Sequence, residues 1–154
     1  MCNHDEAIVA TYARLLAAWN AQDAAGMAAL FAADGALVGF DGSEAQGPRT
    51  IDQQLAPIFR DHPTERFVHV VREVHQVTED VALLRAIAGM VPRDSLELDE
   101  SKNVIQSLVL RRESSGWQIV LFQNTAAKLD GRPEAVAAMS GELRAAARKQ
   151  LGKR

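Results

Sequence analysis

The chain has 154 residues, of which 47% are hydrophobic and 24% are charged, and its formal net charge is −3. This length supports one domain with a self-sufficient core, and the single cysteine, Cys2, excludes an internal disulfide or a cysteine-rich zinc site. The charges of both signs are interspersed, which argues against a nucleic-acid partner. No apolar run approaches the ~18 residues that span a membrane. The acidic start is unlike a signal peptide, so we expect a cytoplasmic protein.

Two helices are predicted at the N-terminus. The evidence for the first is a stripe of apolar residues at helical spacing, Ile8, Tyr12, Leu15 and Trp19. Asp23 is a natural N-cap for a second, shorter helix. This helix is expected to end near Asp34-Gly35 and to turn three apolar residues inward, Met27, Leu30 and Phe31.

A short strand and a third helix follow. The strand is predicted over residues 36–40 and runs into a turn at Asp41-Gly42. Gly47-Pro48 opens the helix, whose apolar residues again recur at helical spacing, Ile51, Leu55, Ile58 and Phe59. Pro57 removes one helical hydrogen bond, so we expect it to kink or split this helix.

From Arg66 onward the apolar period changes to two, which is typical of strands. Four long strands are predicted, over residues 67–78, 81–91, 104–112 and 117–125, and the segment 92–102 is predicted to be a flexible connection. Pro133 begins a last helix. Cations near its end complement the helix dipole, Arg144, Arg148, Lys149, Lys153 and Arg154. Helices followed by consecutive antiparallel strands predict an α+β fold.

Three groups of residues resemble the nuclear transport factor 2-like (SnoaL-like) superfamily over about residues 5–126. The first group opens the chain, with Trp19-Asn20-Ala21-Gln22-Asp23, Ala29-Leu30-Phe31-Ala32 and Asp34-Gly35-Ala36. The second is Gly47-Pro48-Arg49-Thr50-Ile51. The third, Gly116-Trp117-Gln118-Ile119 with Phe122-Gln123-Asn124-Thr125, resembles the SgcJ/EcaC-type branch that is associated with polyketides and enediynes.

The resemblance implies a cone-shaped, curved antiparallel sheet of the cystatin-like type, packed against the N-terminal helices. The cone domain would span residues 1–130, with residues 131–154 as a C-terminal helical extension of the same domain. It also implies a homodimer and an internal ligand pocket. One departure from the branch is Gln123, which stands where a histidine is usual and cannot carry a proton in its place.

The ketosteroid isomerases of this fold use a tyrosine and two aspartates. By the resemblance, the tyrosine falls on Leu15, the first aspartate on Gly39, and the second near Ser107 or Leu108. The sequence fills none of these three roles. We therefore exclude that mechanism, although the fold stands.

Charged residues on the predicted strands give further candidates. His69 is a candidate pocket acid or base. If alternation holds, His69, Glu73 and His75 share one face of the strand. His69 and Glu73 would then stand about 13 Å apart, too far to bind one metal ion, so we expect these side chains to face solvent or a dimer partner. Arg85 interrupts an apolar strand, so it either pairs with a carboxylate such as Glu73 or anchors an anionic ligand.

The predicted last strand ends in two amides, Gln123 and Asn124, and alternation sends one of them inward. A buried amide either satisfies backbone groups or positions a ligand carbonyl or a water. The aromatic residues belong to the core or line the pocket, namely Tyr12, Trp19, Phe31, Phe40 and Phe59. Phosphate-cradling glycine loops, nucleophile elbows and HExxH motifs are absent from the sequence, so we expect no cofactor and no metal.

Two functional hypotheses follow. In the first, a homodimeric domain binds a small apolar or partly polar molecule and catalyses proton transfer, isomerisation, cyclisation or hydration with the help of His69, Gln123 and Asn124. In the second, the chain is a non-catalytic dimeric accessory or ligand-binding module. Neither hypothesis includes a nucleic-acid or membrane partner.

Overall fold

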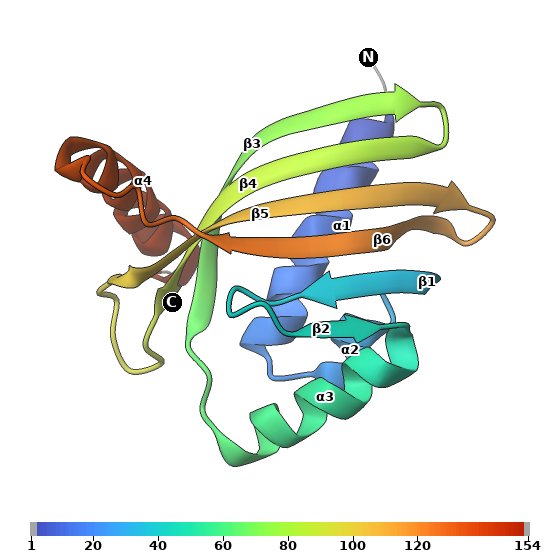
Figure 1. Ribbon diagram of the computed structural model, residues 1–154, viewed down its shortest axis with the longest axis horizontal. Helices are drawn as coiled ribbons and strands as arrows, with labels where there is room; N and C mark the ends of the chain where they lie inside the picture. The colour runs from blue at the N-terminus through green and yellow to red at the C-terminus, as the bar shows by residue number, and fades with distance from the viewer. Residues whose placement is uncertain (1–2, 153–154) are drawn as a thin grey trace.

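The computed structural model describes residues 3–152 of the chain. Cys2, Lys153 and Arg154 lie outside the described residues, so the expectations that concern them stay predictions. Six strands form one curved sheet in the order β2-β1-β6-β5-β4-β3; the helices before residue 62 lie on its inner face and the C-terminal helix lies against its outer face (Figure 1). The predicted α+β class and curved-sheet architecture are therefore confirmed.

The helices are α1 (Asn3–Asn20), α2 (Ala24–Ala28), α3 (Pro48–Asp61) and α4 (Pro133–Leu151). The strands are β1 (Phe31–Val38), β2 (Glu44–Gln46), β3 (Arg66–Thr78), β4 (Val81–Val91), β5 (Asp99–Glu113) and β6 (Gly116–Ala126). Neighbouring strands are antiparallel except β1 and β6, which run parallel. The strand predicted from residue 104 begins earlier, at Asp99, which shortens the connection after β4.

The second helix is shorter than the sequence predicts. Asp23 caps it as expected, because its carboxylate accepts a hydrogen bond from the Gly26 N–H at 2.9 Å. The helix ends at Ala28, however, and Phe31 opens β1 opposite Ile119 of β6. Pairing with β6 gives hydrogen-bond partners to the backbone groups on either side of Phe31. A helix that continued to Gly35 would not form this pairing with the sheet.

Pro57 was expected to kink or split the third helix, and it does not split it, because α3 is continuous from Pro48 to Asp61. Proline leaves the carbonyl of Gln53, four residues earlier, without its helical donor. Gln53 is exposed, so water can satisfy that carbonyl while the apolar side of the helix stays packed. The buried residues of that side are Ile51, Leu55 and Phe59.

A bulge in β3 breaks the alternation on which the sequence argument relied. Val71 pairs with Ala86 and Glu73 pairs with Arg85, so Arg72 is an extra residue. As a result, His69 lies on the inner face, against Tyr12 of α1, whereas Glu73 lies on the outer face beside Arg85. The expectation that His69 and Glu73 share a face is therefore wrong.

Two apolar cores share the sheet. The larger core lies between the inner face and helices α1–α3 and includes Tyr12, Leu84 and Phe122. The smaller core lies between the outer face and α4, and its buried residues are Val68, Ile87, Val91, Met139, Leu143, Ala146 and Ala147. Arg72 of β3 and Glu142 of α4 form an ion pair at 2.7 Å over this second core.

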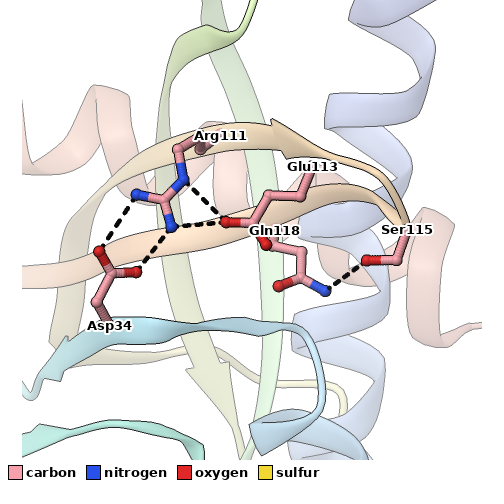
Figure 2. A network of polar contacts seen from close by, with 5 residues as sticks. All are labelled: Asp34, Arg111, Glu113, Ser115 and Gln118. Carbon is pink, nitrogen blue, oxygen red and sulfur yellow. Dashed lines mark hydrogen bonds and ion pairs between the residues drawn. The ribbon is translucent and has the colours of Figure 1, made fainter.

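The start of β1 is held to the sheet by an exposed polar network (Figure 2). Arg111 of β5 donates to Asp34 at 2.8 Å and to Glu113 at 2.6 Å, so one guanidinium joins the β5–β6 hairpin to the irregular part of β1. Gly35 lies within the same irregularity. A Cβ at Gly35 would stand 2.5 Å from the carbonyl oxygen of Ile119, so the close approach of β1 to β6 requires glycine there.

Candidate functional site

Two adjoining hollows lie on the inner side of the sheet. The outer hollow, of about 190 Å³, opens between α3 and the β1–β2 turn and is lined by residues that include Asp41, Ser43, Ile51, Gln54 and Ile58. The inner hollow, of about 90 Å³, reaches deeper between the sheet and α1. The two hollows adjoin, because five residues line both of them: Trp19, Leu37, Gly39, Phe40 and Leu55.

The β1–β2 turn places an apolar side chain at the mouth of the site. The Gly39 N–H donates to the Ser43 carbonyl at 2.8 Å, and the Gly42 N–H donates to the Gly39 carbonyl at 2.9 Å. Gly42 has a φ of +90°, a conformation that glycine adopts without strain. Phe40 projects from this turn with 52% of its surface exposed, and Ile58 of α3, also at the mouth, is 42% exposed.

Trp19 forms a fixed wall of the site. Its indole N–H donates to the Glu65 carbonyl at 2.8 Å, so the ring has no free polar group to offer a ligand. Phe59 meets the indole edge to face with ring centres 5.2 Å apart, and Phe67 lies tilted against it at 5.3 Å. These contacts hold the indole in one orientation, which favours a preformed cavity.

A chain of hydrogen bonds runs from α1 to the inner hollow. The Tyr12 hydroxyl donates to Gln106 Oε1 at 2.5 Å, Gln106 Nε2 donates to Asn124 Oδ1 at 2.9 Å, and Asn124 Nδ2 donates to the Val38 carbonyl at 3.0 Å. Tyr12 and Gln106 are fully buried. Burial raises the pKa of Tyr12 well above its usual value, so the hydroxyl keeps its proton.

Among the described residues that line the two hollows, Asp41 has the one titratable side chain. The Ser43 N–H and the Ser43 hydroxyl both donate to Asp41 Oδ1, at 3.0 and 2.7 Å. These bonds, led by the one from the backbone, hold the pKa of Asp41 below its ordinary value. Asp41 therefore stays ionised at neutral pH and has little affinity for a proton.

The structure brings three of the predicted site residues to the hollows: Trp19, Phe40 and Asn124. Tyr12 lies one step behind Asn124 through Gln106. Phe59 lies behind Trp19, and Phe31 is buried in the core. The aromatic candidates thus divide into residues that line the site and residues that support it.

The remaining candidates lie away from the hollows. The His69 ring packs edge to face on Tyr12, with ring centres 5.1 Å apart, and desolvation lowers the pKa of this histidine. Gln123 is exposed on the outer face, since it precedes the inward Asn124. Arg85 is exposed on the same face, where its Nε donates to Glu73 Oε1 at 3.0 Å, the carboxylate pairing considered from the sequence.

Three residues of the site were not predicted from the sequence: Leu37, Met90 and Gln106. Leu37 and Met90 line the inner hollow, and an apolar strand residue carries no signal that separates lining from core. Gln106 carried a weak signal, as a polar residue within an apolar strand. Its place opposite Asn124 depends on a register shift between Val109 and Leu110, which no residue pattern in the sequence predicts.

Within residues 3–152, the structure gathers no group of three or more histidine, cysteine, aspartate or glutamate side chains that could hold a metal ion. Over the same range, none of the helices combines the length and the apolar character needed to cross a membrane.

Comparison with known proteins places the chain in a family. The model of the SnoaL-like domain family matches residues 8–124, so the chain belongs to this family, as the resemblance indicated at the superfamily level. The match ends before α4 begins. No curated protein matches the chain.

Solved structures share the fold. A domain of unknown function with a cystatin-like fold from Nostoc punctiforme is 24% identical, with a TM-score of 0.77 and coverage of 99% of this chain and 94% of that one. An NTF2-like protein from Novosphingobium aromaticivorans is 19% identical, with a TM-score of 0.70 and coverages of 87% and 88%. A ketosteroid isomerase-like protein from Erwinia carotovora atroseptica is 20% identical, with a TM-score of 0.63 and coverages of 80% and 95%.

Proposed function

We propose that the chain binds a small, uncharged and mainly apolar molecule in the two adjoining hollows. The observation that carries this proposal is the lining of the inner hollow, in which aromatic and aliphatic side chains surround one amide, Asn124. Ligand sites are typically apolar concavities with a few placed polar groups. A charged ligand would lose its hydration there without gaining a partner of opposite charge in the inner hollow.

The same lining favours a ligand-binding function over an enzyme that catalyses proton transfer. General acid–base catalysis needs a group whose pKa lies near the working pH and which reaches the substrate. Asp41 reaches the outer hollow, but its bonds to Ser43 hold its pKa low. The His69 ring contacts the Tyr12 ring edge to face, and His69 lines neither hollow. We therefore favour the ligand-binding module over the isomerase, cyclase or hydratase.

A cavity-filling variant tests this proposal. Leu37→Trp places an indole in both hollows, whereas Val38→Trp, the next residue along β1, places the same side chain on the other face. We expect toluene to shift the amide NMR signals of the lining residues in a saturable way in the wild type and in Val38→Trp, but not in Leu37→Trp. Equal binding by both variants, or none by the wild type, would contradict the proposal.

We also propose that the chain forms the homodimer that the resemblance implies. The supporting observation is a row of half-buried apolar residues across the outer face, Leu83, Val109 and Leu121, which pair with one another across β4, β5 and β6. Helix α4 packs on β3, β4 and the start of β5, where it meets Glu100 and Asn103, and leaves the central part of this face uncovered. Light scattering at several protein concentrations tests the proposal, and a constant monomer mass would overturn it.

The resemblance of the last strand to the SgcJ/EcaC-type branch remains a proposal. Its support is the Gly116–Ile119 and Phe122–Thr125 motif, which forms β6 and supplies Asn124. A sequence tree that groups the chain firmly with a different branch of the family would contradict it.

A further inference from the structure

The hydrogen-bond chain behind the inner hollow has a fixed direction, and a backbone group sets it. Its last acceptor is the carbonyl of Val38, which lies 3.0 Å from an atom of the Asn124 side chain. A carbonyl oxygen accepts and never donates, so that atom must be the amide nitrogen. The opposite placement of the amide would bring two acceptors together at this distance.

Each earlier link follows from the last one. Because Asn124 Nδ2 faces Val38, Asn124 Oδ1 faces Gln106, and Gln106 must present its nitrogen to it, at 2.9 Å. Gln106 Oε1 is thereby left for Tyr12. A phenol either donates or accepts, so Tyr12 adapts to the direction that the backbone imposes.

This direction decides what Asn124 offers to the cavity. Its oxygen is occupied by Gln106, whereas its nitrogen carries two hydrogens, of which one goes to Val38. In the part of the chain that the structure describes, no second acceptor meets that nitrogen, and Asn124 lines the inner hollow. The other polar lining atom there, the indole N–H of Trp19, is already bonded to Glu65.

We infer that Asn124 is the specificity-determining residue of the cavity and donates its free N–H to the carbonyl oxygen of an uncharged, otherwise apolar ligand. The inference rests on the proposed function. A hydroxyl would fit less well, because its own proton would meet no acceptor among the apolar side chains, and an unmade buried hydrogen bond is costly. A carboxylate would have to be desolvated without a cation beside it.

Three probes of similar shape separate these possibilities. Acetophenone carries a carbonyl, 1-phenylethanol a hydroxyl, and α-methylstyrene a methylene group at the same position. Transfer from water alone favours α-methylstyrene, the most apolar of the three. We expect acetophenone instead to bind the wild type most tightly, by about threefold to tenfold over α-methylstyrene, which is the range of one net neutral hydrogen bond.

Variants locate the preference. Asn124→Leu keeps the approximate size of the side chain and removes the donor, so α-methylstyrene should then bind more tightly than acetophenone. Gln123→Leu is the matched control, because Gln123 is the adjacent residue on the outer face and the carbonyl preference should persist. If Asn124→Leu does not fold, the wild type supplies the test: acetophenone, and not α-methylstyrene, should move the NMR signals of the Asn124 side-chain amide.

The outcomes distinguish the inference from the function on which it rests. Tighter binding of α-methylstyrene by the wild type, with an unmoved Asn124 amide signal, overturns the inference and leaves the cavity as an apolar binding site. If neither acetophenone nor α-methylstyrene binds, both the inference and the proposed function are overturned. A carbonyl preference that survives Asn124→Leu also overturns the inference, because another group would then be the donor.

Discussion

Tyr12 is the largest fully buried side chain of the hydrogen-bond chain, and it stabilises the fold more than it directs the ligand. Tyr12→Phe leaves Gln106 Oε1 buried without a donor, so we expect the free energy of unfolding to fall by about 1–3 kcal/mol. Urea unfolding measures this loss. The carbonyl preference should remain in this variant, because Val38 still orients Asn124; a lost preference would show that the direction is set at the Tyr12 end.

His69 makes the stability of the protein depend on pH in a definite direction. Desolvation against Tyr12 lowers its folded pKa below the ordinary value of 6.5, so below that pH the unfolded chain binds more protons than the folded one. This contribution to stability is complete above about pH 6.5 and declines as the pH falls toward the folded pKa. The slope of unfolding free energy against pH in this window should flatten in His69→Gln. An unchanged slope would assign it to other groups.

At this scale the sequence predicted residue types better than residue directions. It identified Asn124 and Gln123 as a pair of which one faces inward, but the choice depends on the register of β6. Counting back from the β5–β6 turn without the register shift would pair Gln106 with Gln123, whereas the structure pairs it with Asn124. A single extra residue in β6 therefore decides which of the two amides joins the hydrogen-bond chain to Tyr12. No local residue pattern indicates this extra residue.

Among the elements, α4 has the clearest separate role, because it supplies one side of the second core. Leu143 is fully buried there, against the outer face of the sheet. We expect Leu143→Ala to lower the free energy of unfolding by about 2–5 kcal/mol through lost contacts and the cavity left behind. Arg144→Ala is the control, because its ion pair with Glu100 is exposed and should contribute less than about 1 kcal/mol.

This comparison also bears on the predicted division into a cone domain over residues 1–130 and an extension over 131–154. Chemical unfolding followed by probes in both parts should give one coincident transition if α4 belongs to the same domain. A separate early transition of α4 would mean that it is an independent unit docked on the sheet.

Element types were predicted well from period and capping, while element ends were not. The helical stripe of α1, the cap at Asp23 and the change of period after Arg66 all correspond to observed elements. Phe31 was placed in a helix because its spacing from Met27 fits one, but pairing with β6 placed it in a strand. For Phe31, tertiary context outweighed local propensity. Pro57 was expected to kink or split α3, and α3 is not split; Gln53 is exposed, so water can satisfy the carbonyl that Pro57 leaves without a donor.

At the scale of the whole molecule, the proposed dimer predicts that a charge introduced on the outer face of the sheet weakens dimerisation. Val109 lies in the middle of the apolar row, between Leu83 and Leu121. Val109→Arg places two like charges near each other if two copies meet there, so the average mass from light scattering should fall toward that of a monomer. Ala56→Arg on α3 adds the same charge away from this face and should leave the mass unchanged. Equal effects of both variants would point to a different interface.

Strand β4 contributes side chains to both cores, and this has a consequence for how the molecule opens. The second half of β4 sends Ala86 and Ala88 into the larger core and Ile87 and Val91 into the smaller one, and its backbone is bonded to β3 and β5. Exchange of its amide hydrogens with deuterium therefore requires release of both layers at once. Residues 86–91 should be among the last to exchange, so the mouth of the site and the far end of α4 can each fray without exposing this strand to solvent.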